Sequence, residues 1–168
     1  MNITGATEVG GVFEFELVRD GKVIDKWQDH NLVTNEGLND LLSVCLVGGT
    51  QKASWYVGLF EGNYTPLATV TAATVASAAT ECTAYDEATR PAWGGATPAS
   101  QSTTNSASKA TFTINATKSV YGAFLVSNNT KGGTGGVLFA ITRFSSVRSV
   151  VATDQLLVTY TVSAASAA

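Results

Sequence analysis

The sequence is poor in the residues that build catalytic and metal sites. It contains one histidine, His30, and two cysteines, Cys45 and Cys82, among 168 residues. These three do not complete a zinc site by themselves, and no Asp-rich calcium loop is present. Asp29 precedes His30, but no serine lies in a Gly-x-Ser-x-Gly turn, so we interpret His30 as a structural residue. The sequence therefore predicts no enzyme activity and no catalytic, cofactor-binding or metal-binding residue.

Charge is also scarce. Charged residues make up 14% of the chain, against about 25% in typical soluble domains. The ten basic residues are scattered along the sequence, so we expect no direct contact with nucleic acid. A signal-peptide pattern and an apolar run of about eighteen residues are both missing, so we expect a soluble protein made in a cytoplasm, without a membrane span. A Cys45–Cys82 disulfide is disfavoured in that compartment.

Two further patterns resemble functional sites only superficially. Asp86 and Glu87 are adjacent, and neighbouring residues of an extended chain point to opposite faces, which makes them a poor acid–nucleophile pair. We interpret them as a solvated loop with a local pairing to Arg90. The glycine-rich residues 132–136 lack the Lys-Ser/Thr ending and the following helix of a phosphate loop. We interpret them as the flexible tip of a hairpin.

Alternating apolar side chains predict β-strands. Phe13, Phe15 and Leu17 share one face of a strand, and Asp20-Gly21 predicts a tight hairpin turn after it. Further strand patterns occupy residues 22–28, 54–60, 109–116, 119–126, 137–144 and 156–162. The segments 119–126 and 137–144 are apolar on both faces, so we expect them to be central strands.

One segment has a clear helical period. Thr34 is placed to cap the helix, and Glu36 lies in its first turn. An apolar stripe follows at i, i+3, i+4, i+7 and i+8, formed by Leu38, Leu41, Leu42, Cys45 and Leu46. We predict one short α-helix over about residues 35–47, with this stripe covering a sheet edge or an open end of the core and with Cys45 buried.

These elements predict a mainly β, single-domain antiparallel β-sandwich or jelly-roll-like barrel with one short α-helix. Residues 12–163 form the domain, residues 1–11 an extended N-terminal arm and residues 164–168 a C-terminal tail. A frayed terminus is an equal alternative for the arm. Residues 65–108 carry all three prolines and little pattern, and we predict a long irregular excursion with one or two strands.

Several stretches of the chain resemble a known family. They include DHNLVTNEGLN, SWYVGLF and TECTAYDEATRPAW, at residues 29–39, 54–60 and 80–93, followed by residues 120–127 and 138–150. Together they resemble small structural proteins encoded by tailed bacteriophages and prophages. The resemblance covers about residues 29–162, and its motifs are structural rather than catalytic.

The resemblance implies a virion protein on the capsid exterior, synthesised in the host cytoplasm. It implies a capsid decoration or cement protein that binds the lattice of the major capsid protein, often as a dimer or trimer. A tail- or baseplate-associated adhesin or carbohydrate-binding module stays open as the alternative. The candidate partner contacts on or beside the arm and the excursion are Ile3, Val9, Tyr64, Pro66, Arg90 and Trp93. Trp93 serves equally well as an interface anchor or as a residue folded back onto the sheet.

Overall fold

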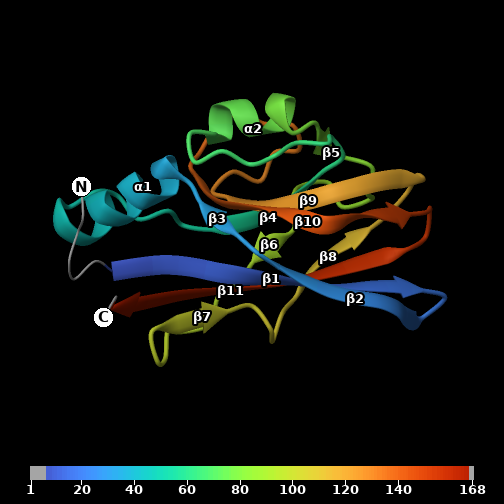
Figure 1. The fold of residues 1–168 in the computed structure, drawn as a ribbon, viewed down its shortest axis with the longest axis horizontal. Helices are drawn as coiled ribbons and strands as arrows, with labels where there is room; N and C mark the ends of the chain where they lie inside the picture. Colours follow the sequence, from blue (N-terminus) through green and yellow to red (C-terminus); the bar gives the residue numbers. More distant parts are fainter. Residues whose placement is uncertain (1–6, 167–168) are drawn as a thin grey trace.

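The computed structural model describes residues 7–166, which form two antiparallel β-sheets packed face to face (Figure 1). The five-stranded sheet has the order β2 (Lys22–His30), β1 (Thr7–Arg19), β11 (Gln155–Ser166) and β7 (Ser102–Thr104), with β8 (Ala110–Thr113) also paired to β11. The six-stranded sheet has the order β3 (Leu32–Val33), β10 (Leu138–Val150), β9 (Lys118–Val126), β4 (Trp55–Phe60) and β5 (Glu81–Cys82), with β6 (Ala92–Trp93) also paired to β4.

The predicted mainly β fold is confirmed, and of its two forms the structure has the sandwich. Over residues 7–166 both sheets are open and do not close into a barrel. The predicted hairpin is present: β1 and β2 are joined by Asp20 and Gly21, both with positive φ (51° and 73°). That backbone geometry suits a tight turn between twisted strands. The segments predicted to be central strands are β9 and β10, which pair with each other inside the six-stranded sheet.

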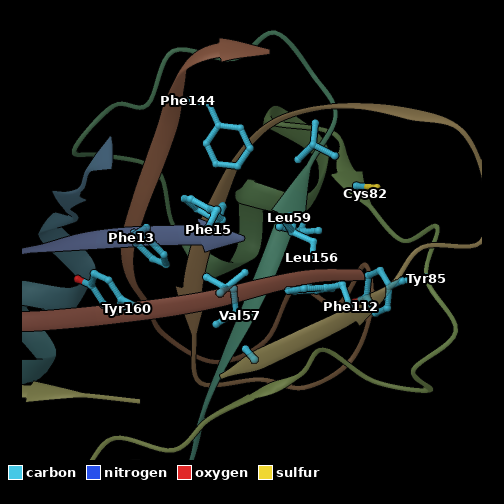
Figure 2. Close-up of a cluster of buried hydrophobic side chains, with 14 of the residues drawn as sticks. Phe13, Phe15, Val57, Leu59, Cys82, Tyr85, Phe112, Phe144, Leu156 and Tyr160 are labelled. Carbon is cyan, nitrogen blue, oxygen red and sulfur yellow. The ribbon is translucent and has the colours of Figure 1, made fainter. Parts of the chain in front are cut away.

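The main core lies between the two sheets. Phe13, Phe15 and Leu17 of β1 are all buried in this core, as their alternation predicts. Figure 2 shows Phe13 and Phe15 among the core side chains. Phe13 stacks on Tyr160 of β11 with ring centroids 3.9 Å apart. Phe15 meets the edge of Phe144 from the opposite sheet at 4.6 Å. These aromatic contacts join β1 to β11 within one sheet and β1 to β10 across the two sheets.

A second apolar cluster covers the outer face of the six-stranded sheet. The short helix α2 (Ala72–Ala78) lies over that face (Figure 1). Val70, Ala72, Val75 and Ala79 pack there on buried residues of β4, β9 and β10: Phe60, Phe124, Val126, Leu138 and Ile141. This layer explains why β9 and the start of β10 are apolar on both faces. α2 was not predicted, because its Ala/Thr/Val sequence has no strong helical signal without the sheet beneath it.

The predicted domain boundaries need correction at both ends. Residues 1–6 of the expected arm lie outside the described residues. Thr7 to Gly11 belong to β1, where they pair with Ser166 to Val162 of β11. Residues 164–166 of the predicted tail belong to β11, which continues to Ser166, and residues 167–168 lie outside the described residues. Strands pair through backbone hydrogen bonds, which do not require alternating apolar side chains. The small residues of this stretch therefore gave no sequence pattern from which the pairing could be predicted.

The excursion at residues 65–108 is more regular than predicted, because it contains α2 and the short strands β5, β6 and β7. Within the described part of the chain, no helix is long and apolar enough to cross a membrane.

Candidate interaction surface

The helix α1 (Asn35–Leu46) is anchored to the sandwich at its N-terminal end. Thr34 is its N-cap, and the Thr34 Oγ1 accepts a hydrogen bond from Gly37 N at 3.0 Å. The same hydroxyl donates to Leu138 O, while Thr34 N donates to Phe139 O at 3.0 Å. One buried threonine therefore caps the helix and fixes it to β10, as the sequence predicts for the cap.

Glu36 and Gly37 complete the anchor. The Glu36 Oε2 accepts hydrogen bonds from Leu138 N at 2.7 Å and Ala72 N at 2.8 Å, which joins α1, β10 and α2. Gly37 is buried against β10, and a Cβ added there would lie 2.5 Å from Phe139 O. Only glycine allows the helix to approach the strand this closely.

The apolar stripe of α1 does not cover the sheet, which corrects the prediction. The helix packs through Gly37 and through the half-buried Leu41 and Val44. Most of the stripe lies on another side of the helix and faces solvent. We give the name α1 ridge to its exposed side chains together with the C-cap residue of the helix: Leu38, Leu42, Cys45, Leu46 and Val47. Leu46 and Val47 are 76% and 79% exposed. The Gly37 contact sets this rotation of the helix, because side chains of the stripe are too large to fit there.

Beside the ridge lies a cleft, which we name the α1 cleft. It encloses about 220 Å³ between α1 and the end of the sandwich, and its walls are mostly apolar. Leu41 and Val44 form one wall, and the aromatic rings of Trp55, Trp93 and Phe139 form much of the other. Asp40 and Lys52 also line it and pair with each other at 2.8 Å. The cleft is therefore mostly apolar, and its two charged side chains neutralise each other.

Of the two roles predicted for Trp93, the structure shows one, and the role of interface anchor stays a prediction. It folds back onto the sheet, where its Nε1 donates to Tyr160 O at 2.9 Å and β6 places it opposite Trp55 of β4. It stays half-buried and lines the α1 cleft. A tryptophan held in this way presents a pre-oriented ring to a partner, which is typical of an interface anchor.

Arg90 is not a partner contact, because its side chain is buried. Its guanidinium pairs with Glu81 through Nε at 2.8 Å and Nη2 at 2.6 Å, and it also donates to Asn128 O and Gly133 O. The predicted pairing with Asp86 or Glu87 is wrong, because Arg90 pairs instead with Glu81, which lies nine residues earlier in the chain and is buried beside it.

The glycine-rich hairpin tip is held by this ion pair. Besides the two carbonyls bound by Arg90, Gly132 N donates to the Glu81 Oε2 at 3.0 Å. Lys131 Nζ donates to Tyr85 O at 2.6 Å and lies 3.8 Å from the centre of the Tyr85 ring. The tip joins β9 to β10 as predicted, and its backbone is fixed by more contacts than a flexible loop would have.

The other predicted contacts do not converge on the α1 cleft. Tyr64 packs near Phe60 in the outer cluster, with ring centroids 6.5 Å apart, and the nearby Pro66 is half-buried. Val9 is half-buried in β1 opposite Ala164. Ile3 lies outside the described residues.

The remaining titratable groups are dispersed. His30 is exposed at the end of β2. Cys45 and Cys82 are both free thiols; Cys45 is exposed, not buried as predicted, and Cys82 is buried, where desolvation raises its thiol pKa. Asp86 is exposed and accepts from Asn115, whereas Glu87 accepts from Thr113 N. Among residues 7–166, no group of three His, Cys, Asp or Glu side chains is arranged to hold a metal ion.

Sequence reasoning missed the ridge and the cleft, although part of the signal was present. A glycine in the first turn of a helix indicates close packing on that side, which here is also the side of Leu41 but not that of Leu38, Leu42 and Leu46. No protein-family model matches this sequence, and no curated protein is similar enough to match it.

Proposed function

We propose that this chain is a structural protein of a bacteriophage particle, and specifically a capsid decoration or cement protein. In this role it binds the lattice of the major capsid protein on the capsid exterior and stabilises the shell without catalysis. It needs neither a cofactor nor contact with nucleic acid or membrane. The resemblance over residues 29–162 supports the phage origin of the proposal.

The observation that carries the role in assembly is the concentration of exposed apolar side chains at one end of the sandwich. Nine large apolar residues are exposed in the described part of the chain, and four of them, Leu38, Leu42, Leu46 and Val47, belong to the α1 ridge. Contiguous apolar surface of this kind marks a contact with another protein. A packed core behind it keeps the surface in a fixed shape, as a shell-binding protein requires.

Binding to shells tests the proposal. Purified chain is added to capsids assembled without it, and bound protein is measured by co-sedimentation and located by imaging. We expect saturable binding to the shell, together with a higher temperature of shell disruption. Many weak contacts repeated over a lattice make such binding tight. Binding to tails with none to capsids would reject the decoration role.

A second candidate function is a tail- or baseplate-associated carbohydrate-binding module. The observation that favours it is the pair of tryptophans in the α1 cleft, Trp55 and Trp93, with Gln51, Lys52 and Asp40 beside them. Aromatic rings with a few polar groups suit a small-molecule site. Glycan-array or host-cell binding that is lost in Trp93→Ala would favour this function over the first. The mostly apolar walls of the cleft favour a protein side chain instead.

A further inference from the structure

We propose that the α1 ridge and the α1 cleft together form a contact with a second copy of this chain, related by a two-fold axis. In this arrangement the ridge of each copy lies across the cleft of the other. The inference assigns to a second copy the same ridge that carries the proposed role in assembly, and it holds whether the dimer binds a capsid or a tail.

The surface has the self-complementary form that a two-fold contact needs. In such a contact the same patch of both copies meets itself, so it must carry both the protruding part and the receiving part. Here both lie on one helix: Leu42 and Leu46 protrude, while Leu41 and Val44 of the same helix form a wall of the cleft. α1 lies at one end of the sandwich (Figure 1), and Leu42 and Leu46 are 54% and 76% exposed.

The charges of the patch also fit a second copy. Between residues 38 and 47 the only charged residue is Asp40, and Lys52 neutralises it at 2.8 Å. The nearby Glu36 carboxylate is occupied by two backbone N–H groups. A two-fold axis brings like groups toward each other, so a patch of either sign would repel itself, and this patch does not. A strongly charged partner would find no unpaired charge here to recognise.

The ridge alone is too small for a stable interface, so the cleft must be part of the contact. A helix of 12 residues is about 18 Å long, so a helix pair alone buries less than the roughly 800 Å² per partner of a standard stable interface. Seating each ridge across the opposing cleft adds the rings of Trp55, Trp93 and Phe139 to the contact. We therefore expect a dimer that dissociates on dilution, not a permanent one.

Sedimentation and light scattering over a wide range of concentration test the inference. The wild-type chain is expected to approach twice its mass of 17.4 kDa at high concentration. Leu46→Asp, at a side chain 76% exposed, is expected to stay at the monomer mass with an unchanged unfolding midpoint at low concentration. Ile24→Asp is the matched control, because Ile24 is an exposed apolar residue of β2, 49% accessible, and should leave the dimer intact.

Cysteine cross-linking gives a second readout on the same surface. Cys45 belongs to the ridge and is exposed, whereas Cys82 is buried. A short bismaleimide is expected to join two wild-type chains through Cys45, and the product should disappear in Cys45→Ser and in Leu46→Asp.

A wild-type chain that stays monomeric at every concentration would overturn the inference, as would a dimer that persists in Leu46→Asp. If the wild type is monomeric and Leu46→Asp loses binding to shells, the ridge is a capsid contact. That result rejects the second copy and leaves the decoration role standing. Normal dimerisation without any binding to phage particles would reject the decoration role alone.

Discussion

At the scale of single residues, the Glu81–Arg90 pair has the largest structural consequence. Both side chains are almost fully buried, with 2% and 0% exposure, and together they hold the segment 81–90 and the 128–133 hairpin tip. A buried ion pair adds little net stability over an apolar pair, but the loss of one partner leaves an uncompensated charge inside the protein. The burial of these two charged side chains is therefore explained by the two segments that they hold together, without a functional role.

Glu81→Ala is expected to lower the free energy of unfolding by about 3–5 kcal/mol, because Arg90 then stays buried without its carboxylate. Urea titration at neutral pH measures this. Lys26→Gln is the control, since Lys26 pairs with Glu16 at the surface and is 64% exposed, and its effect should be far smaller. Equal effects of the two substitutions would show that Arg90 is solvated in solution.

A second prediction at this scale concerns acid stability. Asp154 accepts hydrogen bonds from the Arg19 guanidinium at 2.7 and 2.8 Å, and these, against desolvation, hold the pKa of its carboxyl below the usual 3.8. Because the pKa is lower in the folded than in the unfolded chain, the pair stabilises the fold above the usual carboxyl pKa. That contribution is lost as the pH falls through the folded pKa.

Arg19→Gln should therefore flatten the acid side of the stability profile. The variant is less stable than wild type at neutral pH, and the two curves converge as Asp154 becomes protonated. Urea titrations at a series of pH values measure the difference. Lys22→Gln, an exposed cation of the same hairpin, should leave the acid slope unchanged. Parallel curves for Arg19→Gln and wild type would contradict the assignment to Asp154.

At the scale of elements, the sequence predicted the strands and the helix whose signals lie within their own segments. The β1–β2 hairpin has both an alternating strand and an Asp-Gly turn, and α1 has its own cap in Thr34. α2 has neither a strong stripe nor a charge in its sequence, and it is stabilised by apolar contacts with the six-stranded sheet. Its position depends on strands far away in the chain, so a local reading could not find it.

The candidate site shows the same limit. The leucine stripe of α1 was visible in the sequence, but which side of the helix meets the sheet depends on Gly37 and Phe139, about a hundred residues apart. Trp93 could be singled out as an unplaced aromatic residue. Its pairing opposite Trp55, which makes it part of a cleft, required the β4–β6 register.

Gly37→Ala tests how α1 is seated. Helix propensity alone predicts a gain of about 1 kcal/mol for alanine. The added Cβ would lie 2.5 Å from Phe139 O and 2.8 Å from Phe139 Cα, and these backbone atoms cannot move easily. We therefore expect a loss of about 1–3 kcal/mol, the range for overpacked sites. Asn39→Ala, at an exposed position of the same helix, should be neutral or stabilising in the same urea titration.

At the scale of the whole molecule, the first and last strands of the described residues meet in one sheet. β1 and β11 pair along twelve residue positions, from Thr7↔Ser166 to Val18↔Gln155. β11 also pairs with β7 and β8 on its other side, so the last strand of the described residues is a central one. Contacts this distant in sequence close the fold late, which makes folding slow compared with helical proteins.

Two C-terminal truncations separate the part of β11 that builds the core from the part that only extends the ladder. Ending the chain after Asp154 removes Leu156, Val158 and Tyr160, all fully buried, and we expect no cooperative unfolding transition and no near-ultraviolet circular dichroism. Ending it after Val162 keeps those residues and removes the pairing of Ser163 to Ser166 with Gly10 to Thr7, together with the pairing of Ser163 with Ser102 and the Ala164 N hydrogen bond to Gln101 O. This shorter deletion should retain a cooperative transition at a reduced midpoint, because backbone pairing is lost but the core is complete. A cooperative transition in the longer deletion would show that the remaining strands close the sandwich without β11.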